Sequence, residues 1–212
     1  MQKKIAVIND LSGYGRCSLT VAIPVLSAMG HQCCPIPTAI LSNHTEFPVY
    51  FFDDYTEKMT TYTDKWKELG LSFDAIATGF LGSEAQIGIV MEIVQKLKAE
   101  KTFVVVDPVM GDHGHAYETY TPEMCEQMKE LVCMADVVLP NVTECCILTD
   151  TPYREENWAR KELLNMAMML RLMGAKSVVI TGVREGSCYT NVVLEQGQYD
   201  AKFIRTRSSG GE

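Results

Sequence analysis

A strand-like run that ends in two carboxylates is the first candidate for chemistry in this chain of 212 residues. Residues 103–106 are all apolar, and they lead into a Pro-Val-Met-Gly turn between Asp107 and Asp112. A strand that is apolar on both faces belongs inside a parallel sheet, where ligands gather at the carboxyl ends of the strands. These acids could therefore handle a phosphate-bound cation. They could equally be ordinary residues of the turn, since Asp and Gly are common there.

A second strand-like run, Ala-Asp-Val-Val-Leu at 135–139, stops at a proline and is followed by Asn141 and Glu144. Two neighbouring strand ends would then present oxygen atoms from Asp107, Asp112, Asn141 and Glu144. Mg²⁺ prefers one or two carboxylates together with substrate phosphates over a complete protein cage. The two strand ends together predict a site that handles a magnesium nucleotide.

The first strand-like run, residues 5–8, leads into a loop that contains Gly13 and Gly15. The pattern GxxxxGK[ST] of a phosphate loop is absent, and two glycines without a third are weak evidence for a dinucleotide site. A close approach of the backbone to a small ligand remains plausible. The neutral donors and acceptors at 42–45 would suit a flat polar ring, or they could satisfy the backbone of their own loop.

Apolar runs alternate with helical stretches along the chain, which is typical of βαβ units with a parallel sheet and right-handed crossovers. We expect one domain over residues 1–212. The expected strands are 5–8, 32–37, 75–78, 103–107, 137–139 and 177–181, the helices are 19–29, 83–98, 122–134 and 158–173, and a hairpin at 189–194 and 201–204 precedes a polar, turn-like end at 205–212.

Composition narrows the class of partner. A formal net charge of −8 without a basic run argues against a nucleic-acid groove. No run approaches the ~18 apolar residues of a membrane span, and residues 1–8 do not form a signal peptide. The eight cysteines lack a Cys-x-x-Cys pair and the four histidines complete no zinc pattern, so we expect reduced thiols. These observations predict a cytoplasmic protein that acts on small molecules, without nucleic-acid or membrane partners.

Six segments together resemble the pyridoxal and pyridoxamine kinases of the ribokinase-like superfamily. They occur in the family's order and spacing, and the similarity extends from about residue 5 to 204. The resemblance implies a ribokinase-like α/β fold of three layers, with a mostly parallel central sheet flanked by helices. The segments are Leu-Ser-Gly-Tyr-Gly-Arg at 11–16, Leu-Ser-Asn-His-Thr at 41–45, Thr-Gly-Phe-Leu-Gly at 78–82, Asp-Pro-Val-Met-Gly-Asp at 107–112, Leu-Pro-Asn-Val-Thr-Glu at 139–144 and Val-Ile-Thr-Gly at 179–182.

The resemblance also implies transfer of the γ-phosphoryl group of ATP to the 5′-hydroxymethyl group of pyridoxal, pyridoxine or pyridoxamine, with Mg²⁺, in vitamin B6 salvage. It implies a homodimer as well. Its substrate-binding positions correspond to Asp10, Leu41, Thr45 and Phe80. Asp10 departs from the family, because many relatives have Ser there. A carboxylate at this place could favour a protonated ring nitrogen or an amine-bearing substrate.

On the nucleotide side, the resemblance carries over six residues for ATP and three of the same residues for Mg²⁺. Leu139 replaces a hydroxyl residue of some relatives, so it would act through its backbone or not at all. Residues 110–120 match a flexible lid whose closure would exclude water. The ATP positions are Asp107, Asp112, Leu139, Asn141, Glu144 and Thr181, and the Mg²⁺ positions are Asp107, Asp112 and Glu144.

Phosphoryl transfer also needs a residue that accepts the hydroxyl proton. In this superfamily it is the Asp of a Gly-Thr-Gly-Asp turn, and that sequence does not occur here. We assign no catalytic residue and expect the base beyond Glu212, which makes the chain a carboxyl-terminally truncated kinase with weak or no activity alone. Two alternatives stay open: a hydroxymethylpyrimidine kinase, which shares the Asp-Pro-Val-Met turn, and a non-catalytic protein that binds B6 vitamers.

Overall fold

The computed structural model describes residues 2–45 and 47–207. The chain packs as two compact units, Met1–Val105 and Val106–Glu212, which we describe separately. The prediction of a single domain over 1–212 stays a prediction. In the described part of the chain, no helix combines the length and the apolar character needed to cross a membrane.

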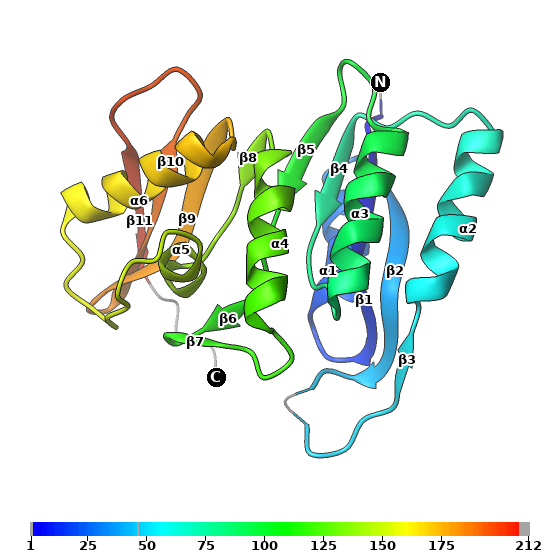
Figure 1. Ribbon diagram of the computed structural model, residues 1–212, viewed down its shortest axis with the longest axis horizontal. Coiled ribbons are helices and arrows are strands. Elements are labelled where there is room, and N and C mark those ends of the chain that lie inside the picture. The colour runs from blue at the N-terminus through cyan, green and yellow to red at the C-terminus, as the bar shows by residue number, and fades with distance from the viewer. Residues whose placement is uncertain (1, 46, 208–212) are drawn as a thin grey trace. The chain divides into compact units, whose positions relative to one another are not determined.

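The first unit is built on a sheet in the order β5-β4-β1-β2-β3. Strand β1 pairs in parallel with β2 on one side and with β4 on the other, and β3 is antiparallel to β2. Helices α2 and α3 lie side by side along this sheet (Figure 1). The elements are β1 (Lys4–Tyr14), α1 (Ser18–Ala28), β2 (Gln32–Asn43), β3 (Phe52–Asp54), α2 (Thr56–Glu68), β4 (Ala75–Thr78), α3 (Glu84–Leu97) and β5 (Phe103–Val106).

The strand order reverses its direction between β1 and β4. The chain passes from β1 to β2 on one side of this point and from β4 to β5 on the other. Right-handed crossovers then put α1 and α3 on opposite faces of the sheet. In open α/β sheets, ligands bind outside the carboxyl ends of the strands at such a reversal. A ligand site is therefore expected at the carboxyl ends of β1 and β4.

The core of this unit comes from strands that are apolar on both faces. Ala6, Ile8, Ile36, Ile76 and Val104 are all completely buried. Each large aliphatic side chain among them contributes roughly 1.5–3 kcal/mol through its burial. This buried sheet provides a rigid support for the loops at its carboxyl edge.

The second unit carries a sheet in the order β8-β9-β10-β11. Strands β8 and β9 are parallel, whereas β9, β10 and β11 form an antiparallel meander. Helices α4, α5 and α6 contact one another and lie on the same side of these strands (Figure 1). The elements are β6 (Gly111–Asp112), β7 (His115–Ala116), α4 (Pro122–Cys133), β8 (Val137–Val138), α5 (Val142–Leu148), α6 (Arg160–Met173), β9 (Ser177–Glu185), β10 (Cys188–Leu194) and β11 (Lys202–Arg207).

Two predicted strands are longer than the sequence indicated. Strand β1 continues past Ile8 to Tyr14, where the sequence predicted a loop, and β2 continues to Asn43. The two extensions pair with each other, from Leu11 with Ile40 to Tyr14 with Asn43, after a register shift. Residues 9–14 are mostly polar residues and glycine, so the sequence predicted a loop. They are extended because they pair with residues 37–43, which are distant in the sequence.

Other elements were absent from the prediction. Helices α2 and α5, strand β3 and the β6–β7 hairpin were missed. Helix α2 is mostly polar and buries only Met59 and Thr63, so its apolar face is too narrow to stand out. The end of the described chain was also predicted wrongly, because Arg205 to Arg207 belong to β11 and pair with β10.

Candidate functional site

The middle of β1 is tied to the loop after β4 by Asn9, a residue that sequence reasoning missed. Its Oδ1 accepts hydrogen bonds from the backbone N–H groups of Asp10 and Phe80, both at 3.0 Å. A Cβ atom at Gly79 would lie 2.6 Å from Cγ of Asn9, so only glycine lets this side chain sit against the backbone. A glycine directly after a predicted strand was the available signal.

Asp10 places a nearly buried carboxylate at this edge of the first unit. Only 6% of the residue is exposed, and its Oδ2 accepts a hydrogen bond from the hydroxyl of Ser12 at 2.9 Å. Ser12 lies opposite Leu41 in the parallel register of β1 and β2, and Leu41 is buried. The structure therefore brings a carboxylate, a hydroxyl and an apolar wall to adjacent strand ends.

The loop that carries Phe80 is anchored by a buried amide. Oε1 of Gln86 accepts from the N–H of Gly82, and Nε2 of Gln86 donates to the carbonyl of Thr38, both at 2.8 Å. The hydroxyl of Thr38 donates to the carbonyl of Phe80 at 3.1 Å. Phe80 is half-buried, and Thr45 lies two residues beyond the end of β2. Of the four predicted substrate positions, Asp10 and Leu41 are buried, Phe80 is half-buried and Thr45 is exposed.

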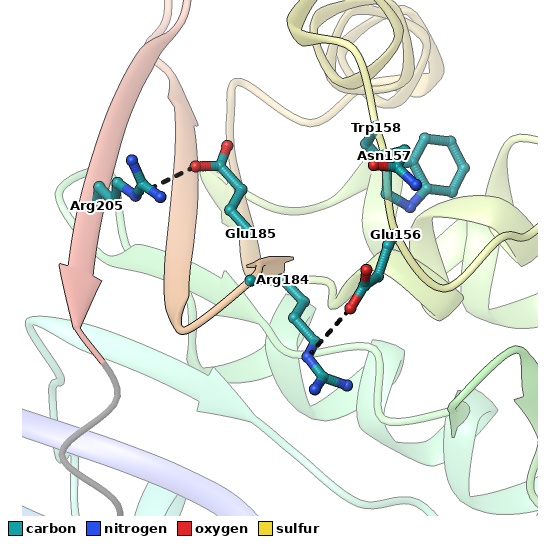
Figure 2. Close-up of a pocket in the computed structure, with 7 residues that line it drawn as sticks. Glu156, Asn157, Trp158, Arg184, Glu185 and Arg205 are labelled. Carbon is teal, nitrogen blue, oxygen red and sulfur yellow. Dashed lines mark ion pairs between the residues drawn. The ribbon is translucent and has the colours of Figure 1, made fainter.

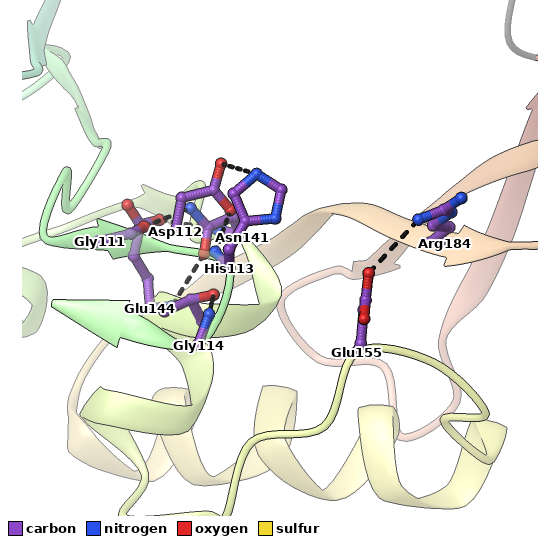
Figure 3. A network of polar contacts seen from close by, with 9 residues as sticks. Gly111, Asp112, His113, Gly114, Asn141, Glu144, Glu155 and Arg184 are labelled. Atoms are coloured by element: carbon purple, nitrogen blue, oxygen red, sulfur yellow. Dashed lines mark hydrogen bonds and ion pairs between the residues drawn. The ribbon is translucent and has the colours of Figure 1, made fainter. Parts of the chain in front are cut away.

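In the second unit, Glu144 is the centre of the predicted nucleotide cluster. It is buried, its Oε1 accepts from the N–H of Met110 at 3.2 Å, and its Oε2 accepts from the N–H of Asn141 at 2.7 Å. Oδ1 of Asn141 accepts in turn from the N–H of Glu144 at 2.9 Å, which completes a capping box at the start of α5 (Figure 3). Glu144 thus ties the turn after β5 to the helix after β8.

Burial and neighbouring negative charge raise the pKa values of carboxyl groups in this cluster. The pKa of Glu144 is raised to about 8, mainly by burial and also by the nearby carboxylates of Asp107 and Asp112, against the opposing effect of the two N–H donors. Burial also raises the pKa of Asp107 to about 6. The structure therefore brings Asp107, Asp112, Asn141 and Glu144 together, as predicted from two separate motifs.

The predicted lid, residues 110–120, contains the β6–β7 hairpin and is bound to α5. Nδ2 of Asn141 donates to the carbonyl of Gly111, and the N–H of Gly114 donates to the hydroxyl of Thr143 at 2.9 Å. A Cβ atom at Gly114 would lie 2.7 Å from Cε1 of the Tyr153 ring. Tyr153 thus packs directly over the hairpin. Its lone aromatic ring in a polar loop gave no signal in the sequence.

Leu139 and Thr181 flank the same cluster. The N–H of Leu139 donates to the carbonyl of Val106 at 2.9 Å, so its backbone donor is already used between strands. Thr181 forms a parallel bridge with Asn141, and its N–H donates to the carbonyl of Pro140 at 2.8 Å. Thr181 is therefore beside Asn141, and Leu139 has an apolar side chain and no free backbone N–H.

The donor set fits Mg²⁺ held together with phosphates. Among residues 2–45 and 47–207, no three His, Cys, Asp or Glu side chains are grouped to hold a metal without help. Both oxygens of Glu144 already accept N–H bonds, and Oδ1 of Asp112 accepts from the N–H of His113 at 2.8 Å. Asp107 and the exposed Asp112 therefore offer the remaining carboxylate oxygens for a cation. Mg²⁺ needs no more than one or two carboxylates when phosphates complete its shell. The predicted base beyond Glu212 lies outside the described residues.

Comparison with known proteins gives matches over almost the whole chain. The family model described as phosphomethylpyrimidine kinase matches residues 21–211. A Bacteroides thetaiotaomicron protein provisionally assigned as a phosphomethylpyrimidine kinase is 39% identical, with a TM-score of 0.95 over 100% of this chain and 73% of its own. A second crystal form of that protein, solved with pyridoxal, is 42% identical, with a TM-score of 0.88 over 93% of this chain and 70% of its own.

Pyridoxal kinases are also similar. The enzyme from Lactobacillus plantarum is 29% identical, with a TM-score of 0.88 over 99% of this chain and 74% of its own. The pyridoxal kinase of Dictyostelium discoideum is 30% identical over 190 residues, which is 86% of this chain. The chain spans 61% of the length of that relative. The structural matches confirm the predicted ribokinase-like fold, with mostly parallel strands flanked by helices.

Proposed function

The chain belongs to the phosphomethylpyrimidine kinase family, and from this premise we propose that it acts as a vitamin B6 kinase. The reaction is transfer of the γ-phosphoryl group of ATP to the 5′-hydroxymethyl group of pyridoxal, pyridoxine or pyridoxamine. The observation that carries the proposal is the cluster of Asp107, Asp112 and Glu144 beside the capping box of α5. Carboxylates with elevated pKa values at a strand end are suited to a cation that arrives with its nucleotide.

The residues of this cluster have separate roles in the proposed reaction. Asp107 and Asp112 would hold Mg²⁺, which when bound neutralises charge on the phosphate oxygens. Glu144 positions the turn and the helix through its two N–H bonds. Asn141 and Thr181 are neighbours in a parallel bridge and would contact a phosphate group of the nucleotide. These groups supply positioning and electrostatic stabilisation, which dominate phosphoryl transfer.

The acceptor would bind at the carboxyl ends of β1, β2 and β4. Leu41 and Phe80 would form apolar walls, Thr45 would bond the ring substituents, and the carboxylate of Asp10 would face a ring nitrogen or amine. Support for a B6 compound comes from the relative that was crystallised with pyridoxal, at 42% identity. The buried carboxylate of Asp10 favours a cationic group on the ligand, since an unpaired buried charge is costly.

A hydroxymethylpyrimidine acceptor is the second candidate. It is favoured by the description of the matching family model and by the Asp-Pro-Val-Met turn at 107–110. The two acceptors are both small heteroaromatic alcohols, so the same walls could accommodate either. Only a direct comparison of ligands separates them.

The test measures the binding of pyridoxal, pyridoxine, pyridoxamine and hydroxymethylpyrimidine by calorimetry, each with and without Mg-ADP, beside ADP formation from Mg-ATP. Binding is measured beside turnover because no residue that accepts the hydroxyl proton is assigned within the sequence. We expect B6 compounds to bind best, with nucleotide-dependent affinity. Asp107→Asn should abolish the nucleotide dependence, and Glu130→Gln, an exposed carboxylate on α4, should preserve it. Preference for the pyrimidine would transfer the assignment to the second candidate.

The same measurements separate a binding protein from an enzyme. If B6 compounds bind but Mg-ADP changes nothing and no ADP forms, the chain is a non-catalytic vitamer-binding protein and the kinase proposal is wrong. We also propose a cytoplasmic location and a homodimer, both supported by the family resemblance. Light scattering on the purified chain tests the dimer, which a monomeric mass at micromolar concentration would contradict.

A further inference from the structure

Strand β9 extends beyond its parallel neighbour and carries an arginine past the candidate nucleotide residues. Its paired part places Ser177 and Val178 opposite β8, and Thr181 bridges Asn141. The strand then continues to Glu185, so Arg184 lies three residues beyond Thr181 on the carboxyl-end side. This is the side of a parallel sheet on which ligands bind.

The guanidinium group of Arg184 is held by two weak ion pairs. Its Nη1 lies 3.5 Å from Oε1 of Glu155, and its Nε lies 3.5 Å from Oε1 of Glu156. About half of the arginine side chain is exposed, and so are large parts of both glutamates. Exposed pairs of this length contribute little stability, and neither is bidentate. The guanidinium group can therefore exchange these partners for a stronger anion.

The surroundings leave room for such an anion. Arg184 lines a cavity of about 340 Å³ together with Glu156, Asn157 and Trp158, where Arg205 pairs with Glu185 at 3.4 Å (Figure 2). Figure 3 shows the Glu155–Arg184 pair in the same close-up as Asp112 and Glu144. The cavity volume would accommodate a phosphate group beside the guanidinium group.

We propose that Arg184 is a further nucleotide-binding residue, which contacts the polyphosphate of the nucleotide and is held by Glu155 and Glu156 until the nucleotide arrives. The inference rests on the proposed kinase function. Arg is suited to the role, because its planar guanidinium group binds phosphate oxygens with two parallel hydrogen bonds. Its positive charge would balance a site that otherwise offers carboxylates. The two glutamates compete with the nucleotide for the same group.

Because Glu155 and Glu156 compete with the nucleotide for Arg184, a binding role and a purely structural role of the arginine predict different results. Mg-ADP affinity is measured by calorimetry for the wild-type chain, Arg184→Gln and the double variant Glu155→Gln/Glu156→Gln. We expect Arg184→Gln to weaken binding about tenfold, as loss of one charge-assisted phosphate contact does. The double variant should tighten binding about two- to threefold, because it removes the competing carboxylates. Arg160→Gln, which removes the same charge from an exposed site on α6, should change the affinity by less than twofold.

The outcomes distinguish this inference from the proposed function. If the wild type binds Mg-ADP and Arg184→Gln binds it equally well, Arg184 is no nucleotide ligand and the kinase proposal stands. Changes in the same direction for Arg184→Gln and the double variant mean that the ion pairs only hold the loop, which also overturns the inference. If the wild type binds a B6 compound but no Mg-ADP, the kinase proposal fails and the inference fails with it. Thermal unfolding of each variant checks that the fold is kept.

Discussion

Binding of Mg-ADP at pH 7 should release about one proton from the carboxylate cluster. With its pKa at about 8, Glu144 is roughly nine-tenths protonated at pH 7, whereas Asp107, with its pKa at about 6, is roughly one-tenth protonated. A divalent cation stabilises the ionised carboxylates and lowers both pKa values. The two groups together therefore give up about one proton when the cation binds.

The sign of the pH dependence follows from the same shifts. Both pKa values are elevated in the free protein and are lowered in the complex, so protons leave on binding and affinity rises with pH. Between pH 6 and pH 8 the gain approaches about tenfold per pH unit, and it flattens above pH 8, where Glu144 is already ionised in the free protein. Salt concentration is held constant throughout, because it also weakens charge interactions.

The assay is calorimetry in buffers of different ionisation enthalpy, where the dependence of the observed heat on the buffer gives the number of protons released. Glu144→Gln should reduce the release to about one-tenth of a proton, the share of Asp107. Glu130→Gln removes an exposed carboxylate from α4 and should retain the full release. Circular dichroism checks the fold of Glu144→Gln, because a glutamine offers one acceptor to two N–H donors. Equal heats in all buffers with unchanged affinity from pH 6 to pH 8 would refute the reasoning, because Glu144 would then be ionised before binding or remote from the cation.

Three further predictions concern the fold and the acceptor site. Gly114→Ala should lower the free energy of unfolding by about 1–3 kcal/mol in urea titrations, because Gly114 has φ of 82° and an added Cβ meets the ring of Tyr153. Gly88→Ala, in open space on α3, should be neutral or stabilising. Equal losses of stability for both variants would contradict the packing of Tyr153 on Gly114. Met128→Ala, at a completely buried position of α4, should cost about 2–5 kcal/mol in the same titrations, against less than about 1 kcal/mol for the more exposed Met168, and similar costs would place Met128 outside the core. Asp10→Asn should reduce the ratio of pyridoxamine to pyridoxal affinity about tenfold, as measured by calorimetry, because it removes the buried charge but keeps an acceptor for Ser12; an unchanged ratio means that Asp10 does not face the amine.

Local patterns were sufficient to predict most of the regular elements. Helix α3 begins after Ser83, whose hydroxyl accepts from the N–H of Gln86, and α4 begins with Pro122 after Thr121. Such signals lie within one helical turn, so they can be recognised from neighbouring residues alone. The all-apolar run of β5 likewise predicted a strand inside a parallel sheet without knowledge of its neighbouring strands.

The acidic motifs at 107–112 and 141–144 could also be recognised in the sequence. That they lie close together in space was inferred from the geometry of parallel strands. The elevated pKa values of Asp107 and Glu144 come from burial, which no spacing of residues reveals. The roles of these residues and of Asp10, Leu41, Thr45 and Phe80 remain predictions for the experiments above.

Sequence alone therefore predicted most of the strands and helices, which strand ends carry polar groups and what class of chemistry those groups suit. Only the tertiary structure decided that Asn9 fills the space over Gly79, that Tyr153 covers Gly114 and that Arg184 reaches Glu155. The physical reason is the separation along the sequence of the residues that interact. Helix caps and apolar periodicity act between close neighbours, whereas these contacts join residues about 30 to 70 positions apart, and such pairs become neighbours only once the sheets have assembled.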